Sequence, residues 1–190
     1  MSDISTDIAA IRARAFEIIR AKSFGRKKII LASGRESDFY FDMKPTLMDP
    51  EGSHHVAELI LDRLRGETVD TVGGVAVGAV PLVASVTTLS FLHKWPLPGF
   101  FVRKEVKDHG TRKLIDGQES IEGRDIAILE DVTTTGQSSM IAVDAARKSG
   151  GNVVLVLSIV DRQEGAEETY RAAGVRFDSI FKASEFLALP

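Results

Sequence analysis

The sequence predicts an α/β protein with a mostly parallel, twisted sheet that is flanked by helices. From about residue 72, short runs rich in Val, Ile and Leu alternate with longer segments of helical character, and this alternation is typical of a parallel sheet with helices on both faces. Glycine, proline and polar residues separate the runs. Ligands bind such sheets at the carboxyl ends of the strands, so the residues after each run are the first candidates for a functional site.

Two helices and a hairpin are expected in the first third of the chain. Residues 6–22 carry apolar side chains at helical spacing, and Thr6 and Asp7 can cap this helix at its start. Apolar and polar residues alternate on both sides of Ser33-Gly34, which predicts two strands joined by a turn. A second helix is expected over residues 51–66.

The rest of the chain is expected to alternate strands with helices. The expected strands cover residues 72–77, 100–103, 125–129, 153–160 and 177–181. The expected helices cover residues 81–94, 137–149 and 165–173. We expect residues 1–190 to form one domain, with an N-terminal subdomain over about residues 1–66 and a core that contains the sheet over about residues 67–190.

Composition excludes several classes of protein. With 190 residues, of which 44% are hydrophobic and 27% charged, the chain suits one globular domain with a well-filled core. A formal net charge of -3 argues against a general nucleic-acid binder. The chain has no cysteine, so disulfides and thiolate metal sites are excluded, as fits a cytoplasmic protein. Charges throughout the first 22 residues argue against a signal peptide or a membrane span.

The run IAILEDVTTTGQS over residues 126–138 is the first candidate site. An apolar strand leads into two adjacent acids, a hydroxyl-rich turn and the polar start of a helix. Hydroxyls and the N–H groups of a helix start receive phosphate, while the acids lie within reach of sugar hydroxyls. The alternative is an ordinary turn with one aspartate as a helix cap, although a cap does not need a second acid. The candidate residues are Glu130, Asp131, Val132, Thr133, Thr134, Thr135, Gly136, Gln137 and Ser138.

This run resembles the phosphoribosyl pyrophosphate (PRPP) binding signature of type I phosphoribosyltransferases. The resemblance implies the type I phosphoribosyltransferase fold, in which a small N-terminal hood covers a PRPP-binding core. It also implies that Glu130 and Asp131 grip the ribose 2- and 3-hydroxyls, and that residues 133–138 hold the 5-phosphate.

A net basic segment, FVRKEVKDHGTRKLIDG over residues 101–117, is the second candidate. By composition it is either a solvated loop or a mobile lid. It resembles the catalytic loop of the orotate phosphoribosyltransferase family. The resemblance implies a lid whose Arg103, Lys104, Lys107 and His109 neutralise the leaving pyrophosphate. It further implies a homodimer in which Lys107 and His109 reach the neighbouring subunit's site, although His109 could instead be a plain surface histidine.

Two further segments resemble the orotate-binding parts of the same family. SGRESDFYFD over residues 33–42 is similar to its N-terminal orotate motif, which implies that Tyr40 and Phe41 contact the base. Either aromatic could instead be a core residue, because neighbours along a strand face opposite sides. Arg162 stands where the family has the arginine that binds the orotate carboxylate, and Thr134 falls near the orotate end of the site.

The chain departs from the common family pattern at two basic positions. Ala32 stands where many members have lysine, and Val77-Gly78 stand where a Tyr-Lys or similar pair is frequent. Lys44 could compensate for the missing lysine. These departures bear on affinity rather than on reaction type.

The resemblance implies a Mg²⁺-dependent enzyme of pyrimidine biosynthesis that acts on PRPP and orotate, with no nucleic-acid or membrane partner. Its catalytic residues are expected to be Lys104, Lys107, His109 and Asp131, and Mg²⁺ is expected to be held through PRPP and water rather than by side chains. Two alternatives remain: a purine phosphoribosyltransferase, and a non-catalytic PRPP-sensing regulator of the same fold.

Overall fold

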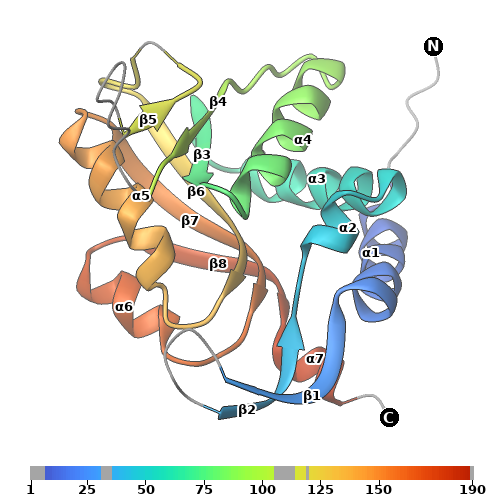
Figure 1. Cartoon of the computed structure of the whole chain (residues 1–190). Helices are drawn as coiled ribbons and strands as arrows, with labels where there is room; N and C mark the ends of the chain where they lie inside the picture. The colour runs from blue at the N-terminus through green and yellow to red at the C-terminus, as the bar shows by residue number, and fades with distance from the viewer. Residues whose placement is uncertain (1–6, 31–35, 105–113, 119, 189–190) are drawn as a thin grey trace.

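A six-stranded sheet forms the centre of the molecule (Figure 1). The computed structural model describes residues 7–30, 36–104, 114–118 and 120–188. The sheet order is β5-β4-β3-β6-β7-β8, and every neighbouring pair is parallel except β4 with β5. The predicted mostly parallel sheet is therefore confirmed. Its strands are β3 (Thr71–Val75), β4 (Gly99–Val102), β5 (Ile115–Asp116), β6 (Asp125–Thr133), β7 (Asn152–Asp161) and β8 (Arg176–Lys182).

The strand order reverses direction between β3 and β6. After β3 the chain adds β4 on one side, and it then returns to add β6, β7 and β8 in turn on the other side. The carboxyl ends of strands at such a switch point open into a crevice, which is the preferred ligand site of this architecture. The acidic pair of β6 lies at this point.

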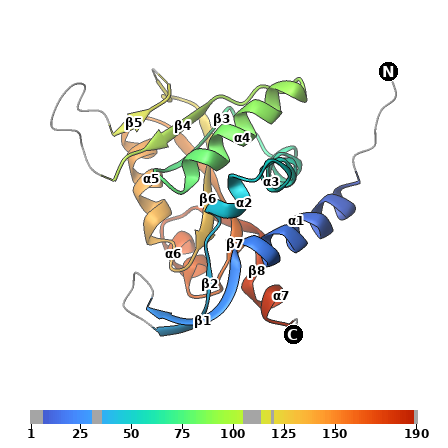
Figure 2. The same ribbon diagram turned by 45° about the vertical axis from the view of Figure 1, so that its right-hand side comes forward.

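Helices cover both faces of the sheet, and the two faces have separate cores (Figure 2). One core contains side chains from α1, α3 and α4, and the other contains side chains from α5 and α6. The helices are α1 (Ile8–Lys22), α2 (Lys44–Leu47), α3 (Pro50–Leu64), α4 (Ala79–Leu92), α5 (Gln137–Lys148), α6 (Ala166–Ala172) and α7 (Ala183–Leu187). Within the described residues, no helix has the length and apolar character needed to cross a membrane.

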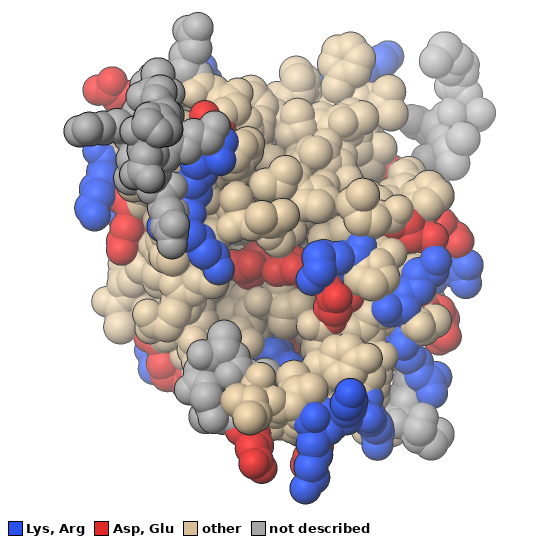
Figure 3. All heavy atoms as spheres, viewed as in Figure 1, with Lys and Arg blue, Asp and Glu red and all other residues tan. Residues whose placement is uncertain are grey.

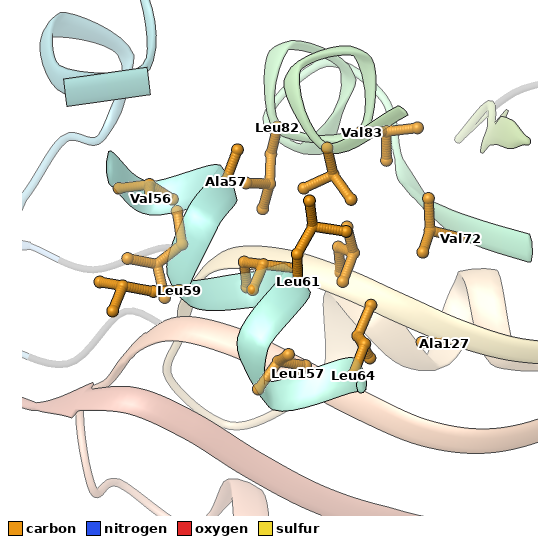
Figure 4. Close-up of a cluster of buried hydrophobic side chains, with 14 of the residues drawn as sticks. Val56, Ala57, Leu59, Leu61, Leu64, Val72, Leu82, Val83, Ala127 and Leu157 are labelled. Carbon is orange, nitrogen blue, oxygen red and sulfur yellow. The ribbon is translucent and has the colours of Figure 1, made fainter. Parts of the chain in front are cut away.

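The first core joins α3 and α4 to the sheet (Figure 4). Leu61 and Leu64 of α3 lie with Leu82 of α4 against Val72 and Leu157 of the strands, and all five are buried. Complete burial of one such side chain contributes about 2 kcal/mol. The α3 helix thus packs on the sheet, although it lies within about residues 1–66, which were expected to form the N-terminal subdomain.

Local side-chain chemistry sets the starts of the first two long helices. The Asp7 carboxylate accepts a hydrogen bond from the Ala10 N–H at 3.1 Å, and the Asp49 carboxylate accepts one from the Gly52 N–H at 2.9 Å. Each satisfies an N–H group that the first turn leaves without a helical partner. Pro50 follows Asp49 at the first helical position, where its missing N–H has no consequence.

The predicted hairpin forms a separate two-stranded sheet. Strands β1 (Phe24–Ile30) and β2 (Glu36–Phe41) pair in antiparallel fashion, and the expected turn at Ser33-Gly34 lies outside the described residues. Phe186 of α7 packs on Phe24 and Phe41 of the hairpin. The hairpin therefore lies at the end of the molecule where the last helix ends (Figures 1 and 2).

The structure differs from the prediction mainly at element ends and in short elements. The strand expected over residues 125–129 continues to Thr133, so both acids belong to β6. The helix expected from Pro81 begins at Ala79, because proline fits within a first helical turn. The prediction omitted α2, β5 and α7, which have 4, 2 and 5 residues and are too short to show a periodic pattern.

Candidate active site

The two acids of β6 face opposite sides of the sheet. Side chains alternate along a strand, and Glu130 is buried with α5 whereas Asp131 is partly exposed. Asp131 instead faces the turn between β3 and α4: a Cβ atom on Gly78 would lie 3.2 Å from Asp131 Oδ2. Asp131 is therefore the more exposed acid of the pair, and the expectation that both acids grip the ribose stays a prediction.

Glu130 lies beneath the start of α5. Glu130 is only 6% exposed, and the Ser139 hydroxyl donates a hydrogen bond to its Oε2 atom at 2.5 Å. Burial, with repulsion by Asp131 as the second cause, raises the pKa of Glu130 to about 8. Both causes favour the protonated form of the Glu130 carboxyl.

We expect Glu130 to make the folded protein less stable as pH rises from about 4.5 to 8. Its pKa is raised from 4.5 to about 8 on folding, so in this window the folded state binds a proton that the unfolded chain has lost. Between pH 5 and 8.5 the wild type should lose on the order of 4 kcal/mol more unfolding free energy than Glu130→Gln. Denaturant unfolding of both proteins at the two pH values measures this difference. Parallel losses in the two proteins would contradict it.

Asp131 accepts a hydrogen bond from the backbone, lies beside the β3–α4 turn and attracts the charge of Lys44. Its Oδ1 accepts the Val132 N–H at 2.8 Å. Lys44 forms an ion pair with Asp42 at 2.6 Å, and the hydrogen bond to Asp42, followed by weaker attraction to Asp42 and Asp131, raises the pKa of Lys44. The Lys44 ammonium thus lies close enough to Asp131 for their charges to attract, whereas Ala32, whose lysine it was expected to replace, lies outside the described residues.

The turn after β3 lies next to Asp131. The peptide bond between Ala76 and Val77 is cis, and the Val77 side chain is exposed. Gly78 follows at the start of α4. A side chain at Gly78 would contact the Asp131 carboxylate, so glycine leaves room there for a ligand to approach the backbone.

The hydroxyl-rich turn connects β6 to α5. Thr134 and Thr135 are partly exposed, and Thr133 is buried. Gly136 adopts a φ of 81° at the N-cap of α5, which glycine adopts without a steric penalty. Gln137 and Ser138 lie exposed in the first turn, where helix N–H groups lack helical partners and attract anions.

The basic strand end supplies cations on the β4 side of the crevice. Arg103 donates from Nε to Asp116 Oδ2 at 2.6 Å, and its guanidinium lies 5.4 Å from the centre of the Phe101 ring. Lys104 is exposed. Lys107 and His109 lie outside the described residues, so their expected contacts stay predictions.

The β2 strand separates the two aromatics that were expected to contact the base. Ser37, Phe39 and Phe41 alternate with more exposed residues. Phe41 packs against Phe24, Phe39 and Phe186, whereas Tyr40, at 36% exposed, covers Gly25 on the other side. Tyr40 and Phe41 thus face opposite sides of the hairpin, as the alternation along a strand had allowed.

Arg162 contacts the hairpin from the end of β7. It follows β7, and its N–H donates to the Thr133 carbonyl at 2.9 Å. The residue is 5% exposed, its guanidinium donates to Ser37 Oγ and to Glu164 Oε1 at 2.9 Å each, and it stacks 4.3 Å from the Phe39 ring centre. These hydrogen bonds use the Nε and Nη2 donors of Arg162. Because a guanidinium has five N–H donors in all, further donors can bind an anionic ligand.

Sequence reasoning missed four residues that position the candidate site: Ser37, Phe39, Ser139 and Glu164. Ser139 could have been found by extending the predicted strand to Thr133, since alternation then turns Glu130 toward the following helix. Ser37 and Arg162 are 125 positions apart. No local pattern links them.

The carboxylates fit a Mg²⁺ ion that is carried mainly by substrate. Among the described residues, no group of three His, Asp or Glu side chains could hold a metal ion. Asp131 and the buried Glu130 are the acids at the crevice. Mg²⁺ often binds through one or two carboxylates together with phosphate oxygens and water, so the donor set is compatible with the expected mode.

The charge distribution on this side of the molecule matches a polyanionic ligand with hydroxyl groups. Figure 3 shows acidic side chains inside a central hollow and basic side chains on both sides of it. Acceptors at the floor can bind hydroxyls, while cations at the rim attract phosphates.

Comparisons with known proteins identify the family. No protein-family model matches the chain. Over 182 residues it is 54% identical to the orotate phosphoribosyltransferase of Rhodopseudomonas palustris strain TIE-1, covering 94% of this chain and 97% of that protein. The crystal structure of Mycobacterium tuberculosis orotate phosphoribosyltransferase with Fe(III) dicitrate has a TM-score of 0.80 at 33% identity, covering 93% of this chain and 98% of that one. The structure of that enzyme in complex with PRPP has a TM-score of 0.77 at 31% identity, with coverage of 93% and 98%. The chain therefore belongs to the orotate phosphoribosyltransferase family of pentosyltransferases.

Proposed function

We propose that this chain transfers the ribosyl phosphate group of PRPP to orotate, as a step of pyrimidine biosynthesis. N1 of orotate loses its proton to solvent and bonds to C1 of PRPP as the C1–O bond breaks, so that orotidine 5-phosphate and pyrophosphate are formed. The observation that carries the proposal is the convergence of Asp131, the Gly78 turn and the hydroxyl-rich turn at the switch point of the sheet, with buried Arg162 bonded to the end of the same strand.

Each half of PRPP has a matching part of the crevice. The 5-phosphate binds the turn over residues 133–138 and the start of α5, where N–H groups attract anions. The Asp131 carboxylate orients the ribose and supports positive charge at C1 as the bond breaks. Backbone N–H groups near Gly78, together with Arg103 and Lys104, bind pyrophosphate. Bound Mg²⁺ would neutralise pyrophosphate charge, and it would be held through PRPP oxygens and water beside Asp131.

Orotate binding is assigned to the boundary between the core and the N-terminal hood of residues 1–66. Arg162 binds the orotate carboxylate through paired hydrogen bonds, and Thr134 lies at the same end of the site. Tyr40 and Phe41 were the expected aromatic contacts. Because Phe39 rather than Tyr40 stacks on Arg162, Phe39 joins them as a candidate for the wall of the base pocket.

The active form is proposed to be a cytoplasmic homodimer in which Lys107 and His109 enter the partner's site. The outer surface of α4 supports self-association. The helix contains no charged residue, and Phe91 and Leu92 are 72% and 68% exposed. The surface over α4 is largely uncharged in Figure 3, and such apolar patches are typical of interfaces.

The proposed reaction is tested by incubating the protein with PRPP, Mg²⁺ and orotate. Loss of the orotate ultraviolet absorbance, with formation of orotidine 5-phosphate, is the expected result. Adenine, guanine and hypoxanthine added as competing acceptors should remain unconsumed. Turnover of a purine instead would favour the purine alternative, and absence of any turnover by folded protein that binds PRPP would favour the regulator.

We expect two inactive variants to restore activity when they form mixed dimers. Lys107→Ala removes a lid residue and Asp131→Asn a core residue, so each mixed dimer keeps one intact shared site. Random exchange of subunits should recover about a quarter of wild-type activity. Asp131→Asn mixed with Arg162→Gln is the matched control, since both residues lie in the same core. Both mixtures are assayed at an orotate concentration far below the KM of Arg162→Gln, where that variant is nearly inactive. Equal activity in the two mixtures would contradict a shared site.

A further inference from the structure

The hydroxyl-rich turn is attached to helix α6 as well as to the strand and helix that it connects. The Thr169 hydroxyl donates a hydrogen bond to the Thr135 carbonyl at 2.7 Å and lies 3.2 Å from the Gly165 carbonyl of its own helix. Tyr170, the next residue of α6, is fully buried beneath Gly136, where an added Cβ would lie 3.0 Å from Tyr170 Cζ. Two successive residues of α6 thus contact two successive residues of the turn.

The contact made by Thr169 fixes the direction of one peptide group. The Thr135–Gly136 peptide is not among the cis bonds of the described chain, and in a trans peptide the carbonyl and the N–H point in opposite directions. Because the carbonyl points toward Thr169, the Gly136 N–H points away from α6. The same bond keeps a carbonyl oxygen, which would repel an anion, turned from the side where the phosphate is proposed to bind.

We propose that Thr169 is a positioning residue, which holds the Thr135–Gly136 peptide with its N–H directed at the 5-phosphate of the ribosyl donor. The inference rests on the proposed function, because it concerns the same phosphate site. Thr169 acts on the ligand through the turn. The Tyr170 ring supports the left-handed conformation of Gly136, whose φ is 81°, and so limits the turn to one arrangement.

The test separates the 5-phosphate end of the site from the pyrophosphate end. Thr169→Val removes the hydroxyl and keeps the shape of the side chain. We expect the dissociation constant of ribose 5-phosphate, measured by calorimetry, and the KM for PRPP to rise about tenfold. The inhibition constant of pyrophosphate should change less than about twofold, and Thr169→Ser should restore the wild-type values.

Thr68→Val is the matched control, because Thr68 is exposed in the segment before β3, at the opposite ends of the strands. If Thr169→Val fails to fold, Thr169→Ala repeats the measurement without a branched side chain. An unchanged affinity for ribose 5-phosphate, or an equal loss for ribose 5-phosphate and pyrophosphate, would overturn the inference. A wild-type protein that binds ribose 5-phosphate but does not consume orotate would contradict the proposed reaction and leave the calorimetric test of Thr169 in force.

Discussion

Replacement of Asp131 by asparagine is expected to lower kcat about 10²- to 10³-fold. The change keeps the shape of the side chain and removes its negative charge. Asp131 lies beside the Gly78 turn in the crevice, whereas burial raises the pKa of its neighbour Glu130 and favours the protonated form of that residue. Asp131 is therefore the acid of the pair that we expect to support positive charge at C1. Steady-state kinetics with orotate and PRPP measures the loss.

The design of the Asp131 experiment separates charge from folding. Asp144→Asn makes the same change on the exposed surface of α5, and its kcat should match that of the wild type. The melting temperature of Asp131→Asn should stay within a few degrees of the wild-type value, since its carboxylate is only partly buried. A kcat within twofold of the wild type would remove Asp131 from the proposed mechanism.

Replacement of Arg162 by glutamine is expected to raise the KM for orotate by about 10²-fold or more. Two charge-assisted hydrogen bonds to a carboxylate contribute on the order of 3 kcal/mol together. Because Arg162 is buried, water cannot supply these hydrogen bonds in place of its guanidinium. The KM for PRPP should change little, because residues 133–138 and Asp131 remain. Initial rates at varied orotate and fixed PRPP, followed by the reverse design, separate the two constants.

Arg176→Gln is the matched control for Arg162. Arg176 also pairs with a carboxylate, through two bonds of 2.8 Å to Glu67, but it is exposed on β8. The control should leave both KM values unchanged. Arg162→Gln should also narrow the preference for orotate over uracil, which lacks the carboxylate. A variant that keeps both its orotate KM and this preference would show that Arg162 does not select the base.

The main elements of the fold could be predicted because their signals are local. The β-branched runs that became β6 and β7 are mostly buried, and the helices α5 and α6 are followed closely by Gly150 and Gly174, which have positive φ. The errors occurred where local signals end. The β6 strand continues through Glu130 and Asp131 to Thr133, because pairing with β7 extends from Asp125 to Thr133 and outweighs the low strand propensity of acidic residues.

The sequence by itself determined the α/β class, the family and the positions at which charged and hydroxyl residues follow the strands. These features depend on hydrophobic periodicity and on motifs within a dozen neighbouring residues. Only the tertiary structure decided that Glu130 turns toward Ser139 while Asp131 turns toward Gly78, and that Arg162 meets Ser37 and Phe39. Such contacts depend on strand order and register, which bring together segments whose separation along the chain leaves no local pattern.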